Sequence, residues 1–299
     1  TIPGFEDAVM LRPGYAIEYD YFPPYQIRRS METKITEGLF FAGQINGTTG
    51  YEEAGCQGLM AGINAARKVQ GKEEFILKRS EAYIGVLIDD LITKGTEEPY
   101  RMFTSRAEHR ILLRQDNADL RLTELGHKIG LASDERFEKF KTKKEAIDKI
   151  HDLFADYTVY PDKMDPMLKE QDTSTLSQPV KAKTLIPRPE LSIFNLMDAD
   201  PELKEKAREI TTDELVYEQV EIQIKYAGYI EKEFEMVEEM KKQEDTLIPD
   251  ELNYDKINSL SAEGKQKMDR IRPETLGQAS RISGVSPSDI SVLMVYLNN

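Results

Sequence analysis

The chain has 299 residues, of which 39% are apolar and 31% are charged, and its net charge is −14. This length suffices for two or three domains with buried cores. No apolar run reaches the roughly 18 residues of a membrane span, no signal-like stretch opens the chain, and a single cysteine excludes an internal disulfide framework. We therefore expect a cytoplasmic protein and, since Thr1 is not an initiator methionine, part of a longer chain.

The first 75 residues alternate strand and helix patterns. Residues 12–21 have the aromatic and β-branched composition of a strand, and the apolar run 38–42 fits a buried parallel strand. A glycine-rich turn follows at 43–50. A helix is predicted from about 51 to 68, and its small residues at spacings of three and four indicate a face that packs closely on a sheet.

Helical patterns dominate the middle of the chain. Ser80 and Gly95 bracket a helix with an apolar stripe, and residues 135–154 form a charged helix. Repeated prolines in 155–200 predict loops with short pieces of structure. One long helix with a single apolar stripe is predicted from about 212 to 243.

The last fifty residues predict several short helices. Ser286-Pro287-Ser288-Asp289 is a helix start with a serine cap and an early proline, and Gly284 ends the helix before it. This pair of helices also resembles a helix-turn-helix, so a DNA-binding module is an alternative function. Against it, the helix at 288–297 contains no Lys or Arg for the DNA backbone.

Acidic residues gather between residues 200 and 255, where 18 Asp and Glu accompany 7 Lys and Arg. The helix at 212–243 lies in this segment. It is either a solvated face over a buried stripe or a docking surface for a protein partner. Since phosphate binding depends on where the cations lie, the total charge does not exclude a nucleic-acid partner elsewhere.

The turn at 43–53 is the strongest candidate for a ligand site. A glycine-rich turn that leads from a strand into a helix brings backbone N–H groups toward an anionic ligand or the pyrimidine edge of a reduced flavin, and Gln44 could hydrogen-bond a ribityl hydroxyl. The alternative is a structural turn whose glycines serve only backbone geometry. The chain contains no G-x-G-x-x-G and no P-loop pattern, so it has no self-sufficient dinucleotide site.

Several ordered stretches together resemble the family of the tRNA uridine 5-carboxymethylaminomethyl modification enzyme, once called glucose-inhibited division protein A. The resemblance runs from residue 1 almost to residue 299. It is carried by residues 12–20, 38–54, 98–108, 116–123, 223–230 and 277–285.

The resemblance implies an FAD-dependent enzyme that works with a GTPase partner. Together they add a carboxymethylaminomethyl group to carbon 5 of the wobble uridine of certain tRNAs, with NADH as reductant and a folate-derived one-carbon unit. It also implies a homodimer in the full-length enzyme. The family's FAD-pyrophosphate motif, nicotinamide-contacting segment and functional cysteines lie in an amino-terminal half that this sequence does not contain, so no catalytic residue is assigned here.

Carried over position by position, the family's flavin contact falls on Gln44, with Gly43, Gly47, Thr48 and Gly50 as flanking turn residues. The resemblance places the GTPase on the helical carboxy-terminal region. We therefore expect this chain by itself to bind the GTPase but not to retain FAD.

A group of five arginines within 21 residues is the candidate tRNA contact, with Arg101, Arg106 and Arg110 as its main members. Arginine suits phosphate, and aromatic side chains suit base stacking. The alternative is a salt-bridged surface. The group also includes Arg114 and Arg121, and the rings of Tyr100, Phe103 and His109 lie among the arginines in the sequence. The possible acidic partners are Glu108, Asp116 and Asp119.

Other chemically notable residues receive structural interpretations. Cys56 is interpreted as a small core residue and not a catalytic thiol. The three histidines show no metal-ligand spacing. Asp89 and Asp90, adjacent in a helix, point about 100° apart and are interpreted as a solvated edge or cap partners.

Taken together, the sequence and the resemblance predict an α+β fold. Residues 1–75 are expected to be the remnant of an α/β FAD-binding domain, residues 76–210 a mixed, mainly helical region, and residues 211–299 a helical carboxy-terminal domain.

Overall fold

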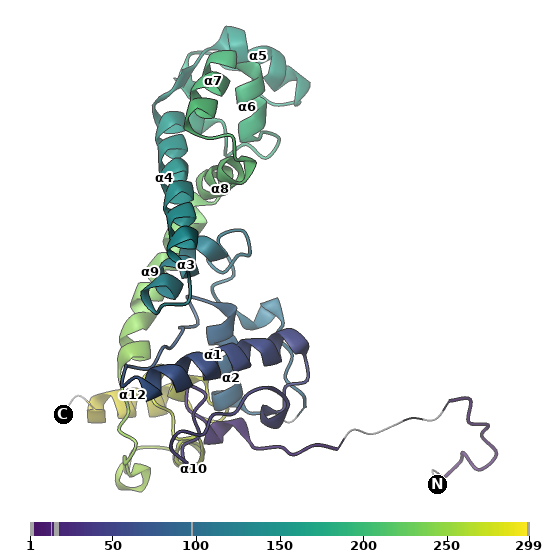
Figure 1. The fold of residues 1–299 in the computed structure, drawn as a ribbon, viewed down its shortest axis with the longest axis vertical. Helices are drawn as coiled ribbons and strands as arrows, with labels where there is room; N and C mark the ends of the chain where they lie inside the picture. Colours follow the sequence, from purple (N-terminus) through teal and green to yellow (C-terminus); the bar gives the residue numbers. More distant parts are fainter. Residues whose placement is uncertain (1–2, 13, 15–17, 97, 298–299) are drawn as a thin grey trace. The chain divides into compact units, whose positions relative to one another are not determined.

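The computed structural model describes residues 3–12, 14, 18–96 and 98–297. It is mainly helical, and the one sheet assigned in these ranges is the antiparallel pair β1 (Thr158–Val159) and β2 (Val180–Lys181). The chain forms two compact units (Figure 1), which we call unit 1 (1–76, 87–102 and 248–299) and unit 2 (77–86 and 103–247). No helix within the described ranges is long and apolar enough to cross a membrane.

Unit 1 brings together the two ends of the chain. Its first part holds η1 (Pro24–Gln26), η2 (Gly43–Asn46) and the helix α1 (Tyr51–Val69), and its last part holds η5 (Tyr254–Lys256), α10 (Ala262–Ile271), α11 (Leu276–Arg281) and α12 (Pro287–Leu297). The two parts are tied by polar contacts. Arg29 Nε donates to Glu274 Oε2 at 2.8 Å, and Lys34 Nζ donates to the Ile271 carbonyl at 2.7 Å.

The helix α2 (Tyr83–Lys94) is buried on nearly every side, and the boundary between the two units falls within it. It ends as predicted at Gly95, whose φ of +72° is the left-handed conformation that favours glycine. It begins at Tyr83, three residues later than the predicted cap at Ser80. In unit 2, Gly85 has no room for a side chain, since a Cβ there would overlap the carbonyls of Leu77 and Lys78.

Unit 2 is a helical assembly around one apolar core. Its elements are η3 (Thr104–Arg106), α3 (Ala118–Lys128), α4 (Asp134–Asp156), α5 (Pro161–Glu170), η4 (Ala182–Thr184), α6 (Ile193–Ala199), α7 (Pro201–Ile210), α8 (Glu214–Lys225) and α9 (Ala227–Asp245). The predicted charged helix is confirmed as α4, capped by Ser133, whose Oγ accepts from the Arg136 N–H at 3.3 Å. The core includes Ile150, Phe154, Leu196 and Val220, all fully buried.

Two predicted elements differ in the structure. The run 38–42 is not a strand: Phe40 forms only a single antiparallel bridge to Glu32, and Leu39 is 42% exposed. An apolar run becomes a strand only where a partner strand pairs with it, and the described chain provides none there. The strand predicted at 12–21 lies partly outside the described residues, and residues 18–21 are not in a strand.

The helix predicted from 212 to 243 is interrupted at Tyr226, which separates α8 from α9. The apolar stripe is buried in α8 at Val220 and Ile224. It is not buried in α9, where Phe234 is 56% exposed and Met240 is 40% exposed.

Candidate functional site: the turn before helix α1

A single buried side chain, Gln57 of α1, holds the turn that precedes this helix. Its Oε1 accepts from the Gly43 N–H at 2.8 Å and from Asn46 Nδ2 at 3.0 Å, and its Nε2 donates to Thr48 Oγ1 at 2.8 Å. Gln57, Asn46 and Thr48 are all fully buried. The Thr48 hydroxyl, predicted to face a cofactor, is therefore held inside the protein by Gln57.

The glycines of the turn have a direct structural role. Gly43 and Gly47 have φ values of +79° and +73°, which side chains rarely adopt. A Cβ on Gly47 would also lie 2.7 Å from Thr96 Oγ1, and a Cβ on Gly50 would overlap the Glu53 carboxylate. Backbone geometry thus favours glycine at positions 43 and 47, and the place of the Glu53 carboxylate favours it at position 50.

The turn nevertheless leaves polar groups unsatisfied. Asn46 Oδ1 is buried and has no hydrogen-bond partner in the described part of the chain. Gln44 is exposed, and no other described residue hydrogen-bonds its amide. The helix α1 begins after Gly50 without a cap from that residue. The Glu53 carboxylate accepts from its own N–H, and the N–H groups of Tyr51 and Glu52 remain for an anionic ligand.

An acidic side chain lies beside this helix start and is partly neutralised. Glu53 accepts from the Met102 N–H at 3.1 Å and lies 3.7 Å from the Arg101 guanidinium. Burial by itself would raise the pKa of Glu53, but the hydrogen bond from Met102 and the charge of Arg101 outweigh it and lower the pKa. The carboxylate is therefore a fixed negative charge, which restrains how much anionic charge a ligand can bring here.

The glycine face of α1 does not pack on a sheet as predicted. Side chains built on Gly55, Gly58 and Gly62 would meet no atom within 4 Å of their Cβ, and Leu59 on the same side is 52% exposed. The buried face is the opposite one, where Met60 is 1% exposed.

Cys56, also on α1, is half-buried, and so it is not the core residue that was predicted. Burial, followed by the charges of Glu53 and Glu52, raises the pKa of its thiol. The thiol therefore stays protonated near neutral pH, a state that does not favour nucleophilic attack.

The arginines predicted for tRNA contact are divided between the two units. Arg101 belongs to unit 1, whereas Arg106 and Arg110 belong to unit 2. Arg101 is 58% exposed beside Glu53, Arg106 is half-buried, and Arg110 is exposed with no ion pair to a described residue.

The other members of that group are mainly structural. Arg114 pairs with Asp116 at 3.2 Å, and Arg121 donates to the Glu81 and Arg114 carbonyls. Glu108 pairs with Arg79 at 2.8 Å.

Of the three aromatic rings near these arginines, one is free to stack on a base. Phe103 is 59% exposed, whereas Tyr100 is 4% exposed and directs its hydroxyl to Asp90 at 3.4 Å. His109 is also buried and donates from Nδ1 to Glu233 Oε1 at 2.6 Å.

The interpretation of Asp89 and Asp90 as a solvated edge was wrong. Both are buried in unit 1, where Asp89 receives two hydrogen bonds from Arg281 and Asp90 pairs with Lys94 at 2.8 Å. Arg281 lies 192 residues further along the chain, so sequence spacing gave no sign of this pair. Gln57 was missed for a similar reason, since a polar residue amid small residues of a helix does not reveal what it holds.

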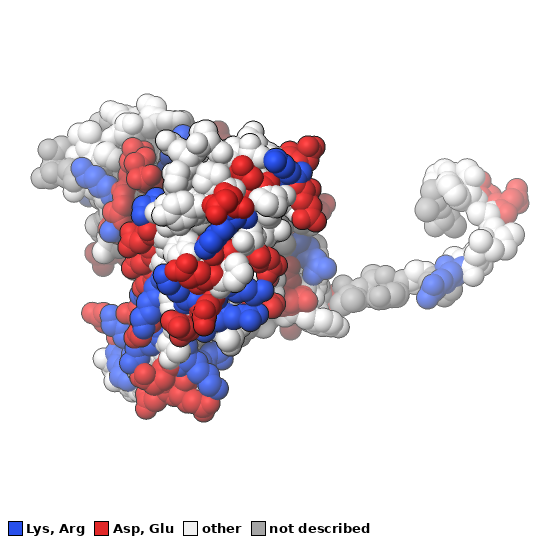
Figure 2. Space-filling model, turned by 90° about the horizontal axis from the view of Figure 1, so that it is seen from above, with Lys and Arg blue, Asp and Glu red and all other residues white. Residues whose placement is uncertain are grey.

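The described residues contain no group of three or more His, Cys, Asp or Glu side chains placed to hold a metal ion. On the face of the molecule in Figure 2, Lys and Arg side chains are interspersed with Asp and Glu. Such mixing provides local cations without an extended basic area, and so it favours contacts at particular residues over broad electrostatic attraction.

Comparison with known proteins identifies the class. Three family models match consecutive parts of the chain: "Glucose inhibited division protein A" over residues 1–73, "tRNA modifying enzyme MnmG/GidA C-terminal helical domain" over 134–234, and the "C-terminal helical bundle" of the same enzyme over 236–299. The fold and these matches all point to one family, which the models name MnmG/GidA or glucose inhibited division protein A.

Individual relatives and a solved structure point to the same family as the models. A protein of Salinibacter ruber named tRNA uridine 5-carboxymethylaminomethyl modification enzyme MnmG is 56% identical over all 299 residues, which make up 45% of its length. A Clostridium novyi protein of the same name is 55% identical over 99% of this chain and 46% of its own length. The Aquifex aeolicus GidA structure in its form II crystal has a TM-score of 0.80 at 43% identity, over 99% of this chain and 46% of that one.

The chain belongs to the MnmG/GidA family, and it spans just under half the length of the curated relatives it matches. The helical architecture of the described residues agrees with the Aquifex aeolicus structure.

Proposed function

We propose that this chain forms part of an FAD-dependent enzyme that adds a carboxymethylaminomethyl group to carbon 5 of the wobble uridine of tRNA, together with a GTPase partner. The observation that carries the proposal is the 56% identity to the Salinibacter ruber enzyme over the whole chain. The names of the relatives specify the modified base and the group. FAD, NADH and the GTPase rest on the family resemblance and on the local features described next.

The turn before α1 has the groups that one side of a flavin site needs. Asn46 Oδ1 and the Gln44 amide offer an acceptor and a donor–acceptor pair, and the uncapped start of α1 offers N–H groups to an electron-rich ring edge. Gly43, Gly47 and Gly50 let the backbone approach closely, and Thr48 supports the turn through Gln57. Bound FAD would supply the redox chemistry, while these residues hold and orient it.

The chain contains no pyrophosphate motif, so we expect it not to retain FAD by itself. The test is the absorption spectrum of the chain after incubation with FAD and gel filtration. A protein peak with flavin absorbance would contradict this part of the proposal. A colourless peak is the expected result.

For tRNA, Arg110 is the member of the arginine group that is exposed and forms no ion pair with a described residue, and the exposed ring of Phe103 lies seven residues before it in the same unit. Arg101 and Arg106 are proposed as further phosphate contacts. We expect Arg110→Ala to weaken binding about equally for different tRNAs, because phosphate contacts carry no sequence information. The control is Arg208→Ala, at an exposed arginine of the same unit that forms no ion pair with a described residue. Unchanged filter binding of Arg110→Ala, measured beside this control, would show that Arg110 does not contact tRNA.

For the GTPase partner, we propose a docking surface on α9. This helix buries none of its own residues and combines exposed Tyr229 and Phe234 with acidic side chains. Acidic charge disfavours tRNA there and leaves a protein partner as the better fit. Co-purification of this chain with the GTPase, lost in a Phe234→Ser variant, is the expected result. If Phe234→Ser leaves co-purification unchanged, the GTPase does not dock on this part of α9.

The DNA-binding alternative is not supported. Residues 236–299 match the helical bundle of the tRNA-modifying family, and Asp289, Ile290 and Leu293 of the supposed recognition helix are buried. The homodimer, the cytoplasmic location and the division at about 75 and 210 stay predictions.

A further inference from the structure

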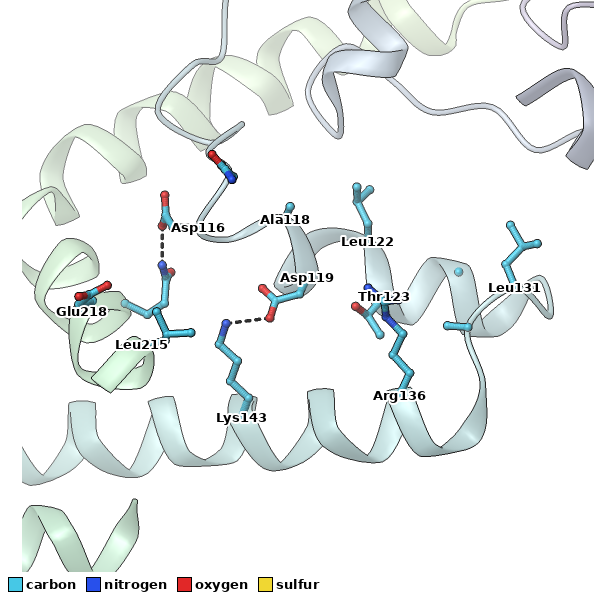
Figure 3. Close-up of a pocket in the computed structure, with 14 residues that line it drawn as sticks. Asp116, Ala118, Asp119, Leu122, Thr123, Leu131, Arg136, Lys143, Leu215 and Glu218 are labelled. Carbon is cyan, nitrogen blue, oxygen red and sulfur yellow. Dashed lines mark hydrogen bonds and ion pairs between the residues drawn. The ribbon is translucent and has the colours of Figure 1, made fainter. Parts of the chain in front are cut away.

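Unit 2 contains a groove of about 880 Å³ that the proposed function does not use. Its walls come from three helices, each of which contributes one face (Figure 3). The face of α8 carries Leu215, Glu218 and Gln219 at spacings of three and four, and the face of α4 carries Arg136 and Lys143 seven residues apart. The α3 wall includes Ala118, Asp119, Leu122 and Thr123.

One buried polar group in this groove lacks a partner. Gln219 is 2% exposed, and its Nε2 donates to the Asp116 carboxylate. Because a carboxylate only accepts, the amide orientation is fixed and Oε1 must be the other atom. Gln219 Oε1 is buried without a hydrogen-bond partner in the described chain, a costly state that a donor from a ligand would relieve.

The charges of the groove are arranged as a dipole. Lys143 pairs with Asp119 at 2.7 Å, and Arg114 pairs with Asp116 at 3.2 Å. Glu218 and Arg136 form no ion pair with any described residue, and they lie toward opposite ends of the groove in Figure 3. Since Arg136 and Lys143 are seven residues apart on α4, that interval alone spans about 10 Å along the helix axis.

The space between the unpaired charges is partly apolar. Leu215, which is 58% exposed, and Leu122 on the α3 wall lie between these charges, whereas Leu131, also 58% exposed, lies beyond Arg136. A complementary ligand therefore carries a cationic donor at the Glu218 end, apolar groups in the middle and an anion at the Arg136 end.

We propose that this groove binds a short segment of a partner protein with Lys or Arg at one end, apolar side chains in the middle and Asp or Glu at the other end. A lysine or arginine head has enough donors to reach both the Glu218 carboxylate and Gln219 Oε1. RNA fits less well, because its phosphates recur at every nucleotide and would meet Glu218 and Asp116. The inference does not depend on FAD, on tRNA or on the GTPase surface of α9.

The test begins with a displayed library of random 12-residue peptides, selected on this chain and counter-selected on a Leu131→Ser/Leu215→Ser variant. We expect enriched peptides to carry a basic residue at one end, an acidic residue at the other and apolar residues between them. Enrichment of no peptide, or of peptides without this charge order, would overturn the proposal.

The second step measures the affinity of one enriched peptide by fluorescence anisotropy. The charge reversal Glu218→Arg/Arg136→Glu should weaken binding at least tenfold and should favour a peptide with its end charges exchanged. Glu124→Arg, an exposed change on α3 outside the groove, should alter affinity less than twofold. The assignment would be overturned if the charge-reversed variant bound the peptide as tightly as the unchanged chain. It would also be overturned if the variant lost binding to an RNA oligonucleotide but kept binding to the peptide. Unchanged circular dichroism confirms that the variants fold.

Discussion

Unit 1 and unit 2 both bury apolar side chains, and unit 1 also uses buried polar contacts to hold the candidate turn. Unit 2 packs α4 to α8 around one extended apolar cluster. Unit 1 buries Ile27, Met60 and Leu91 and an apolar cluster in its last part, and it adds buried polar contacts, such as those of Gln57 in the turn and of Asp89 with Arg281. Buried polar groups cost free energy unless they are paired, so a unit built on them fixes particular backbone positions. In unit 1 such contacts hold the turn that carries the candidate cofactor groups.

The largest expected effect is on stability and tests the apolar core of unit 2. Phe154→Ala in unit 2 removes a fully buried ring from the core and should lower the free energy of unfolding by about 3–5 kcal/mol. Phe103→Ala, which removes a ring that is 59% exposed, should change it by less than about 0.5 kcal/mol. Urea denaturation measures both, and similar losses would contradict the description of this core.

The polar side of the comparison is tested at Gln57. Gln57→Met keeps the size of the side chain but leaves the Gly43 N–H and the Asn46 amide without their acceptor. We expect a loss of about 2–4 kcal/mol, because each unsatisfied buried group costs about 1–3 kcal/mol. The matched control is Gln70→Met at the exposed end of α1, which should be neutral. A neutral Gln57→Met would mean that Gln57 does not hold the turn.

A smaller, pH-dependent effect belongs to Asp289 in unit 1. Although burial opposes ionisation, hydrogen bonds from Ser286 and Ser261 lower the pKa of Asp289 to about 2. An unfolded aspartate has a pKa of about 3.9, so the carboxylate stabilises the folded state above that pH and loses this contribution as the pH falls to about 2. Asp289→Asn should lower the free energy of unfolding by about 2 kcal/mol at pH 6. The difference in unfolding free energy between this variant and the unchanged protein should become smaller below pH 4. A difference in unfolding free energy that does not change with pH would contradict the lowered pKa.

The sequence predicted features that depend on neighbouring residues. The start of α4, the glycine at the end of α2 and the serine and proline at the start of α12 follow from capping chemistry within a few residues. The position of the candidate turn was predicted for the same reason, although the strand predicted before it, at 38–42, does not form.

Features that depend on distant residues could not be predicted in this way. Asp89 is buried because Arg281 reaches it, and the exposure of Phe234 depends on what packs against α9. The five arginines are close in sequence, yet Arg101 and Arg106 belong to different units. Within the turn, Thr48 was predicted to face a ligand, but Gln57 holds its hydroxyl.

The most direct test of the central claim is FAD binding by a chimera that joins this chain to the part of the Salinibacter ruber relative that it does not cover. The claim is that the turn before α1 forms one side of a flavin site. It predicts that the chimera retains FAD and that Gln44→Ala weakens FAD binding at least tenfold, while Gln70→Ala changes it less than twofold. Equal FAD affinity of the Gln44→Ala chimera and its parent would contradict the claim.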